Sequence, residues 1–417
     1  MILTAPIVLG MQSSGAPFQN GAIMIKHGVI AAVGPLHRII RRYPSHRMHA
    51  WNDAVLMPGL VNTHTHLELP PLLEKIHASS FPSWVLNLIA IKKTLALRHY
   101  TRAASANIRT LIKTGTTTVG EICTHDVSPT LLKQSGMRAI VYKEIIVMAP
   151  SNKGRSGSER GIRISGLPHS KSIMQGISPH SPYSVSEAVL LQIERAVRRS
   201  DIRLAMHIAE SKDEVKLLQR KKSGLERIYR YANWNLDWAP KGISPFAYLQ
   251  RIGFLSSNLI AVHGVQTTNE DIDIIKKSGV SIAHCPRSNR ELKVGKMPLR
   301  KFLDAGIPVG LGTDSLASAP SLSLWDEMRY AYQIHRRSGI TPKDILHLAT
   351  LGGAKALGME HEIGTIEPGK KADIIAVPLP RRNTGDLYSD LLRETKSCIM
   401  SMVNGKIIYL PQNSERT

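Results

Sequence analysis

The feature that most constrains the fold is a regular alternation of short apolar runs with amphipathic stretches, which occupies most of the chain. Eight apolar runs have the length and composition of buried strands: 56–63, 115–122, 138–147, 176–180, 203–208, 259–264, 280–285 and 308–313. Helical patterns lie between them, for example at 82–113, 186–199, 269–278 and 321–337. Because successive strand–helix units are typical of a closed parallel barrel, we predict an α/β protein with a (β/α)8 TIM barrel.

Both ends of the chain instead show short strands and tight turns. His27-Gly28 separates two apolar runs near the N-terminus, and Asn404-Gly405 separates two near the C-terminus. Asn-Gly in such a place is a strong signal for a two-residue hairpin. We therefore expect a small β-sandwich domain built from both termini beside the barrel, with the boundaries 1–56 and 363–417 for the sandwich and 57–362 for the barrel.

Two connections are longer than usual for such a barrel. Residues 149–175 are rich in glycine, serine and arginine, which predicts a mobile loop or a lid. Residues 220–250 are basic and carry several aromatic side chains, so they either cap a pocket or cover the barrel wall.

Histidine and acidic residues recur where the apolar runs end. These residues are His64, His66, Glu121, Glu144, His180, His207, His263, His284 and Asp314. TIM barrels carry their chemistry at the C-terminal ends of the strands. We therefore expect many of these side chains to converge on one site.

His64 and His66 are the most informative of these residues, because they lie two positions apart. On a strand, such side chains point to the same side, so both imidazoles can bind one divalent metal. With a third imidazole and Asp314 they form a nitrogen and oxygen set suited to Zn²⁺ or Fe²⁺. Taken singly, each residue has another explanation. A buried histidine can simply be hydrogen-bonded, Asp314 can cap a helix, and Glu210 can be a solvated charge.

The formal net charge of +22 at pH 7 is unusually high. Nucleic-acid binding would explain it, but the basic residues are spread along the chain and aromatic residues make up only 5% of it. Without a clustered patch or a stacking surface we expect no nucleic-acid partner. Attraction of an anionic small substrate is another explanation.

The composition also indicates the compartment. No apolar run reaches the roughly 18 residues of a membrane span, and the first ten residues lack the basic region of a secretory signal. The three cysteines are an odd and sparse set, which favours a reducing environment. We expect a cytoplasmic protein with no membrane partner.

Together these segments resemble the amidohydrolase superfamily, in its branch of cytosine deaminase-like and chlorohydrolase-like enzymes. The resemblance extends over nearly the whole chain. It is carried by Pro-Gly-Leu-Val-Asn-Thr-His-Thr-His at 58–66 and by residues 178–186, 207–210, 263–264, 284–289, 312–315 and 364–373.

The resemblance implies specific roles for several residues. One divalent metal, Zn²⁺ or Fe²⁺, would be held by His64, His66, His207 and Asp314. Glu210 would be the proton shuttle, His263 would orient the attacking water, and Asp314 would accept a proton from it. Relatives with two metals bridge them with a modified lysine at the end of the fourth strand. That strand here ends in Ser178-Pro179-His180, which implies a single metal and makes His180 a substrate contact.

Within this branch, residues 67–69, 284–289 and 314–318 look most like aminodeoxyfutalosine deaminases of menaquinone biosynthesis. This likeness implies a hydrolytic deaminase that converts 6-amino-6-deoxyfutalosine to futalosine with release of ammonia. It also implies an anionic small-molecule nucleoside as the substrate, whose benzoate Arg287 or Lys92 would bind. The substrate contacts that we predict are Glu68, His180, Arg287 and Ser315.

Other functions stay open at this point. The motifs are also similar to methylthioadenosine/S-adenosylhomocysteine deaminases, which hold the ribose with a carboxylate on the helix after the first strand. Residues 88–93 read Leu-Ile-Ala-Ile-Lys-Lys and carry no such group. Another ring deaminase or a chlorohydrolase of the branch, and a non-catalytic binding protein of this fold, are further alternatives. Relatives in this branch are often dimers or larger, so the resemblance also implies a homodimer.

Overall fold

The computed structural model describes residues 1–12, 15–148, 170, 172–198, 200–238, 242–382 and 384–411. Eight parallel strands form its centre, hydrogen-bonded in chain order. They are β6 (Leu60–Thr65), β7 (Thr116–Cys123), β8 (Arg138–Ile145), β9 (Ile173–Pro179), β10 (Arg203–Ile208), β11 (Leu259–His263), β12 (Ser281–His284) and β13 (Val309–Leu311). A bridge between Thr65 and Asp314 brings the last strand back to the first. The predicted TIM barrel is confirmed, and each predicted apolar run overlaps one of these strands.

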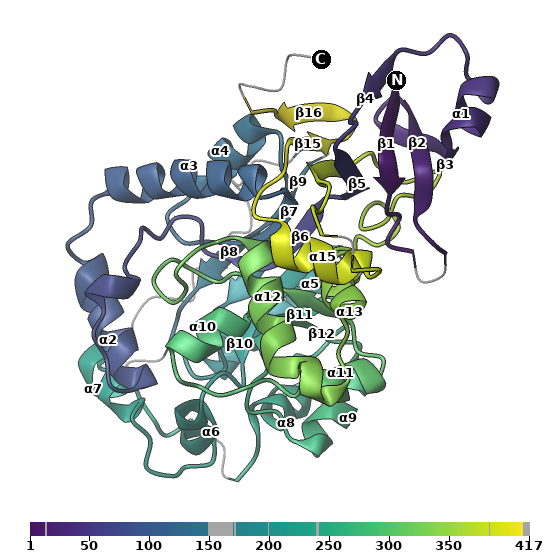
Figure 1. Cartoon of the computed structure of the whole chain (residues 1–417). Coiled ribbons are helices and arrows are strands. Elements are labelled where there is room, and N and C mark those ends of the chain that lie inside the picture. The colour runs from purple at the N-terminus through teal and green to yellow at the C-terminus, as the bar shows by residue number, and fades with distance from the viewer. Residues whose placement is uncertain are drawn as a thin grey trace.

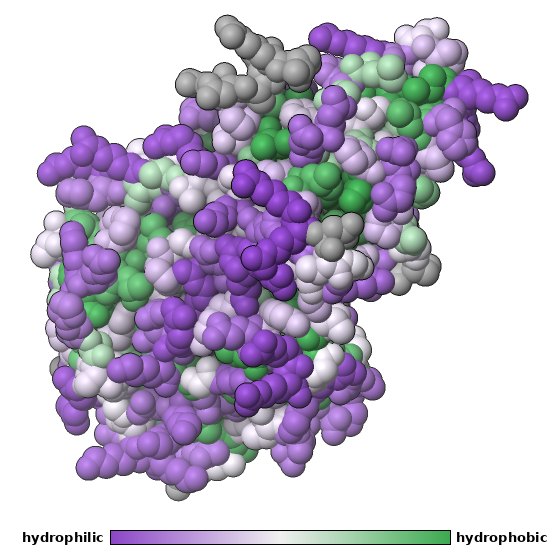
Figure 2. Space-filling view, in the orientation of Figure 1, coloured by the Kyte–Doolittle hydropathy of each residue, from purple (hydrophilic) through white to green (hydrophobic). Residues whose placement is uncertain are grey.

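Helices surround this barrel (Figure 1). They are α2 (Phe81–Lys92), α3 (Leu97–Lys113), α4 (Ser128–Ser135), α5 (Glu187–Val197), α6 (Lys212–Leu218), α7 (Glu226–Ala232), α8 (Pro245–Arg251), α9 (Asn269–Ser278), α10 (Pro286–Glu291), α11 (Leu299–Asp304), α12 (Leu324–His335), α13 (Pro342–Leu348) and α14 (Leu351–Ala356). In Figure 2, hydrophilic side chains gather over α12 on the face turned to the viewer.

The helical pattern at 82–113 forms two helices, α2 and α3, instead of one. The break comes at residues 93–96, where the amides of Thr94 and Leu95 bond to carbonyls three residues back, so the α-helical ladder stops. The helix α2 packs against α7, and Lys93, the residue after α2, donates a hydrogen bond to Tyr231 of α7. The segment 220–250 therefore contributes to the surroundings of α2, whereas nearly all of the predicted loop 149–175 lies outside the described residues.

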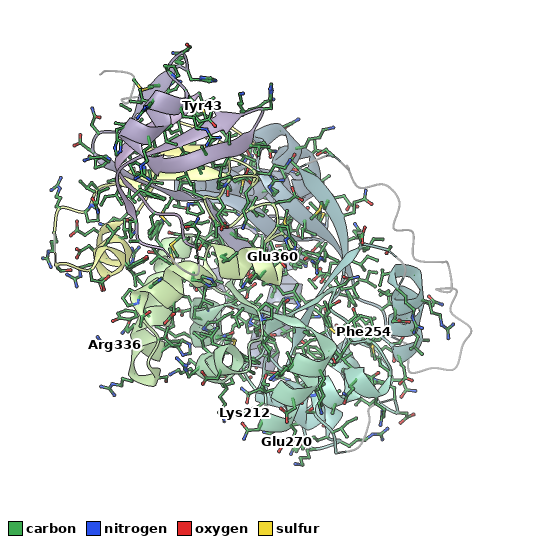
Figure 3. All side chains as sticks on the ribbon, turned by 90° about the vertical axis from the view of Figure 1, so that its right-hand side faces the viewer. Tyr43, Lys212, Phe254, Glu270, Arg336 and Glu360 are labelled. Atoms are coloured by element: carbon green, nitrogen blue, oxygen red, sulfur yellow. The ribbon has the colours of Figure 1, made fainter. Side chains whose placement is uncertain are left out.

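A second sheet joins the two ends of the chain, as predicted. Its strands lie in the order β16-β15-β14-β5-β1-β2-β3, with β4 paired to β1. From the N-terminal part come β1 (Ile2–Val8), β2 (Phe18–Lys26), β3 (Val29–Pro35), β4 (Met48–Ala50) and β5 (Ala54–Pro58), and from the C-terminal part β14 (Ile374–Pro378), β15 (Met400–Val403) and β16 (Lys406–Tyr409). The helix α1 (Leu36–Arg42) lies in the N-terminal part, and α15 (Leu387–Glu394) lies in the C-terminal part. Figure 3 shows Tyr43, just after α1, and Glu270 of α9 at opposite ends of the molecule.

Both predicted hairpins form. His27 and Gly28 have φ angles of 47° and 78°, and Asn404 and Gly405 have 49° and 73°. Positive φ at both central residues is the requirement of the two-residue turn that matches the twist of antiparallel strands.

The run at 56–63 crosses from one sheet to the other. Its first residues belong to β5, which pairs with β14, and its last residues belong to β6 of the barrel. Pro58-Gly59 marks the passage. A Cβ atom on Gly59 would lie 2.1 Å from Oγ1 of Thr117, so the close approach of β6 and β7 requires glycine here.

Candidate metal centre and active site

Three histidines meet at the C-terminal ends of β6 and β10. The ligand nitrogens of His64, His66 and His207 lie within 4.8 Å of one another, which is close enough for one ion. His64 is buried, and neither of its ring nitrogens has a hydrogen-bond partner among the described residues. A buried polar group without a partner is unfavourable, and a metal ion would satisfy it. The donor set therefore fits Zn²⁺ or Fe²⁺.

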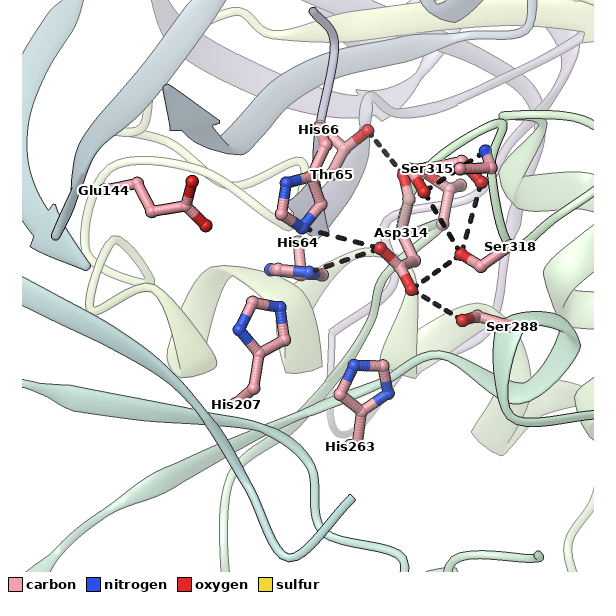
Figure 4. Close-up of polar contacts among 12 residues, drawn as sticks. His64, Thr65, His66, Glu144, His207, His263, Ser288, Asp314, Ser315 and Ser318 are labelled. Atoms are coloured by element: carbon pink, nitrogen blue, oxygen red, sulfur yellow. Dashed lines mark hydrogen bonds and ion pairs between the residues drawn. The ribbon is translucent and has the colours of Figure 1, made fainter. Parts of the chain in front are cut away.

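Asp314 completes this cluster from the loop after β13. Its Oδ1 lies 3.7 Å from Nε2 of His64 and 3.5 Å from Nε2 of His66. Its Oδ2 accepts hydrogen bonds from the hydroxyls of Ser288, at 2.6 Å, and Ser318, at 2.8 Å (Figure 4). The backbone of Asp314 is left-handed, with φ of 55°, a conformation that a residue other than glycine adopts only when the surroundings enforce it.

Hydrogen bonds also set the direction of the two other imidazoles. Nδ1 of His207 lies 2.9 Å from the carbonyl oxygen of His180, so that nitrogen donates and Nε2 is left for a metal. Nδ1 of His263 lies 2.9 Å from Oδ1 of Asn289. Nε2 of His263 is 3.5 Å from Oε1 of Glu210. The structure thus brings together the imidazoles and carboxylates to which the sequence analysis assigned metal binding and proton transfer.

Glu210 is buried beside this cluster. Burial, with the nearby charges of Asp314 and Glu214, raises the pKa of Glu210 well above its usual range. A raised pKa favours the protonated form of the Glu210 carboxyl, which is the form that can act as an acid. Glu214 fixes the backbone next to Glu210. Its carboxylate accepts hydrogen bonds from the backbone N–H groups of Ala209, at 3.0 Å, and Glu210, at 2.8 Å.

A pocket that opens to solvent leads to these groups. One wall is apolar and comes mainly from α2 and the α7 region: Trp84, Val85, Leu88, Ile89, Ile228 and Trp234. The predicted substrate contacts His180 and Ser315 line the pocket, as do Lys92, Thr124 and Glu144. An apolar pocket with a few convergent polar groups is typical of small-molecule sites.

Glu144 is an acidic lining residue for which no role was predicted, although its position at the end of β8 was the signal for one. The hydroxyl of Thr124 donates to its Oε2 at 2.8 Å. Burial disfavours its ionised form, but His180, Lys92 and His66 together lower the pKa of Glu144 to about 2. Glu144 is therefore an ionised acceptor inside the pocket.

Residues 55–408 match the sequence model of the Amidohydrolase family. This chain belongs to the amidohydrolase family. The amidohydrolase is 30% identical to a 5-methylthioadenosine/S-adenosylhomocysteine deaminase of Syntrophobacter fumaroxidans, over 98% of this chain and 91% of the relative. It is 29% identical to a 5'-deoxyadenosine deaminase of Methanobrevibacter smithii, over 93% of this chain and 85% of the relative. The resemblance found in the motifs is confirmed.

Solved structures have the same fold. An adenosine deaminase of Xanthomonas campestris with bound zinc has a TM-score of 0.82 and 27% identity, and the alignment covers 97% of this chain and 92% of that one. The aminofutalosine deaminase of Helicobacter pylori, in complex with methylthio-coformycin, has a TM-score of 0.87 and 24% identity, with 97% and 99% covered. The second likeness supports the fold.

Two predicted substrate contacts of this amidohydrolase, Glu68 and Arg287, lie outside the pocket lining. The Glu68 carboxylate accepts the backbone N–H groups of four residues between β7 and α4, at 2.6 to 3.0 Å: Thr124, His125, Val127 and Ser128. Nη1 of Arg287 donates to Ser321 at 2.8 Å and lies 3.7 Å from Oε1 of Glu327. Both side chains are thus engaged within the protein, and of the two cations named for the benzoate, Lys92 lines the pocket and Arg287 does not.

The part of the chain that the structure describes contains no helix long and apolar enough to cross a membrane. All three cysteines, Cys123, Cys285 and Cys398, are buried and free.

Proposed function

We propose that this amidohydrolase is a hydrolytic deaminase that converts the adenine ring of a nucleoside to its hypoxanthine form and releases ammonia. The observation that carries the proposal is the meeting of a metal-ligand cluster and the buried Glu210, whose pKa is raised, in one largely apolar pocket. The relatives named as deaminases of adenine nucleosides support the same reaction.

Each residue of the site has a separate role in the proposed reaction. One divalent ion, Zn²⁺ or Fe²⁺, held by His64, His66, His207 and Asp314, would supply a water whose pKa is lowered to about 7. His263 would orient the attacking water through Nε2, and Asp314 would take a proton from it and pass that proton to the leaving amine. Glu210 would donate its own proton to N1 of the ring and regain one from the attacking water. The water oxygen thus replaces the amine at C6, and ammonia leaves.

We put 6-amino-6-deoxyfutalosine first among the substrates, which would place the protein in menaquinone biosynthesis. Lys92 supports this choice, since it is the one lysine or arginine among the lining residues. Its charge already acts on Glu144, whose pKa it helps to lower, and a carboxylate on the substrate would give it a second anionic partner. The apolar wall with Trp84 and Trp234 suits the aromatic ring that carries the carboxylate.

The second candidate is a nucleoside without that benzoate, such as methylthioadenosine, S-adenosylhomocysteine or 5'-deoxyadenosine. The apolar wall suits a small apolar group at the 5' carbon equally well. The names of the relatives at 30% and 29% identity favour it.

Ammonia release from these four nucleosides by metal-analysed protein tests the proposal. We expect Glu210→Gln to lose about 10²- to 10⁴-fold in kcat with its metal content unchanged, which is the contribution of a positioned acid. Lys92→Met should raise KM for aminodeoxyfutalosine alone if the benzoate is bound there, and the exposed Lys75→Met is the matched control. Absence of ammonia release from the whole panel would overturn the proposal, and chloride release from a chlorotriazine would redirect it to the chlorohydrolases.

We also propose a cytoplasmic location, which the buried free thiols support. A homodimer stays a prediction, and sedimentation of the purified protein would test it.

A further inference from the structure

A carboxylate with one free oxygen faces the pocket at the end of β8. Oε2 of Glu144 is held by the hydroxyl of Thr124 at 2.8 Å, whereas Oε1 has no hydrogen-bond partner among the residues described. Figure 4 shows Glu144 and Asp314 on opposite sides of His66. Glu144 is thus separate from Asp314, which lies 3.5 Å from Nε2 of His66, and from Glu210, which lies 3.5 Å from Nε2 of His263.

The charges around Glu144 limit what it binds. An ionised carboxylate is an acceptor only, so it recognises O–H or N–H donors or a cation. Lys92 lies in the same pocket, and the donor set at His66 calls for a metal cation, so a cationic ligand group would be repelled. A second anionic group placed against Glu144 would be repelled by its carboxylate, so an anionic part of the substrate would bind Lys92 instead. A neutral group with hydroxyl donors satisfies both conditions, and two adjacent hydroxyls match the two oxygens of a carboxylate.

The position of Glu144 also suits a particular part of the substrate. It lines the same pocket as the cluster at which the base must react and the apolar wall of α2. In a nucleoside, the sugar is the part between the base and the 5' substituent. The side chains of α2 that line the pocket are apolar, apart from Lys92, and offer no acceptor for sugar hydroxyls.

We propose that Glu144 is the specificity residue that binds the 2'- and 3'-hydroxyls of the ribose, and that Thr124 positions its carboxylate for this contact. This inference rests on the proposed function, since it assigns the sugar of a nucleoside to β8. The base then lies at Glu210, and the 5' substituent lies along Trp84 and Trp234.

A structural role for Glu144 would have different consequences. A carboxylate often accepts a hydrogen bond from the second nitrogen of a metal-bound histidine, and here that histidine would be His66. Loss of such a contact lowers metal content and weakens the reaction of every substrate equally. Loss of a sugar contact leaves the metal in place and affects only substrates that carry the hydroxyls.

The test compares adenosine with 2',3'-dideoxyadenosine in the wild type, Glu144→Gln, Thr124→Val and the exposed control Glu74→Gln. For Glu144→Gln we expect kcat/KM for adenosine to fall about 10- to 100-fold, mainly because KM rises. A loss of this size corresponds to one or two hydrogen bonds to a charged group. The value for the dideoxynucleoside should change by less than about 3-fold, and Thr124→Val should give a smaller loss of the same kind. Metal content should equal that of the wild type in every variant.

Three results would overturn the inference. An equal loss on both nucleosides, or a loss of metal from Glu144→Gln, would make Glu144 a support of the metal cluster. Unchanged kinetics on both would remove Glu144 from binding. In these cases the wild type still deaminates nucleosides, so the proposed function stands. A wild type that releases ammonia from no nucleoside overturns the proposed function and this inference together.

Discussion

The hydroxyl of Ser288 donates a hydrogen bond of 2.6 Å to Oδ2 of Asp314, and this bond turns the other oxygen, Oδ1, toward His64 and His66. Ser288 comes from α10, after β12, and Asp314 follows β13. A residue that binds no metal itself thus sets the direction of an expected ligand, as outer hydrogen-bond partners do in many metal sites.

Substitution Ser288→Ala should weaken metal binding about 10-fold, because Asp314 would lose one of the two donors that hold Oδ2. Chelator competition followed by metal analysis measures this affinity. The exposed Ser45→Ala is the control, and both variants should fold like the wild type. Equal affinity in Ser288→Ala and in the wild type would show that Ser318 alone is enough to orient the carboxylate.

Substitution Glu68→Gln should lower stability by about 2 kcal/mol and leave KM unchanged, because the Glu68 carboxylate accepts four backbone N–H groups and an amide cannot replace both oxygens. Thermal unfolding and steady-state kinetics on the same preparation measure the two effects. A raised KM with unchanged Tm would instead restore Glu68 as the substrate contact expected from the sequence.

Stability should also depend on pH through Glu327. Burial raises the pKa of Glu327 to about 8, although Arg287 lies beside it, whereas an unfolded glutamate has a pKa of about 4.3. Between these values the folded state holds a proton that the unfolded state has released. The contribution of Glu327 to stability is therefore complete below the lower pKa and is lost as the pH rises through the higher one.

Glu327→Gln removes this dependence, because an amide does not titrate. The Tm of the wild type minus that of the variant should fall by roughly 2 °C or more between about pH 5 and pH 8. The exposed Glu74→Gln should show a constant difference over the same range. A constant difference for Glu327→Gln as well would mean that its pKa is not raised on folding.

Features that depend on neighbouring residues were predictable. The eight barrel strands follow from the recurrence of apolar runs, and the two hairpins follow from His27-Gly28 and Asn404-Gly405, because strand periodicity and turn geometry are local properties. The pairing of His64 with His66 is local in the same sense, since alternate residues on a strand share a face.

Features that depend on contacts between distant segments were predicted less well. The run at 56–63 was divided between two sheets by pairing of β5 with β14, more than three hundred residues away in the chain. The helical pattern at 82–113 was interrupted where α2 turns to pack on α7. Glu68 and Arg287 are charged residues of the kind that bind substrates. In the folded protein, however, both side chains bind groups from other helices and loops of the chain instead.

The amino-acid order was thus sufficient for the barrel, the family motifs and the histidine and carboxylate candidates, because these reside in periodicity and in short spacings. Only the tertiary structure determines which carboxylates are free to bind a substrate. Glu68 and Glu144 are alike as residues, yet four backbone amides hold one and a single hydroxyl holds the other, leaving an oxygen of Glu144 toward the pocket. The hydrogen-bond partners of a side chain depend on which distant segments pack against it, and a local sequence pattern does not contain that information.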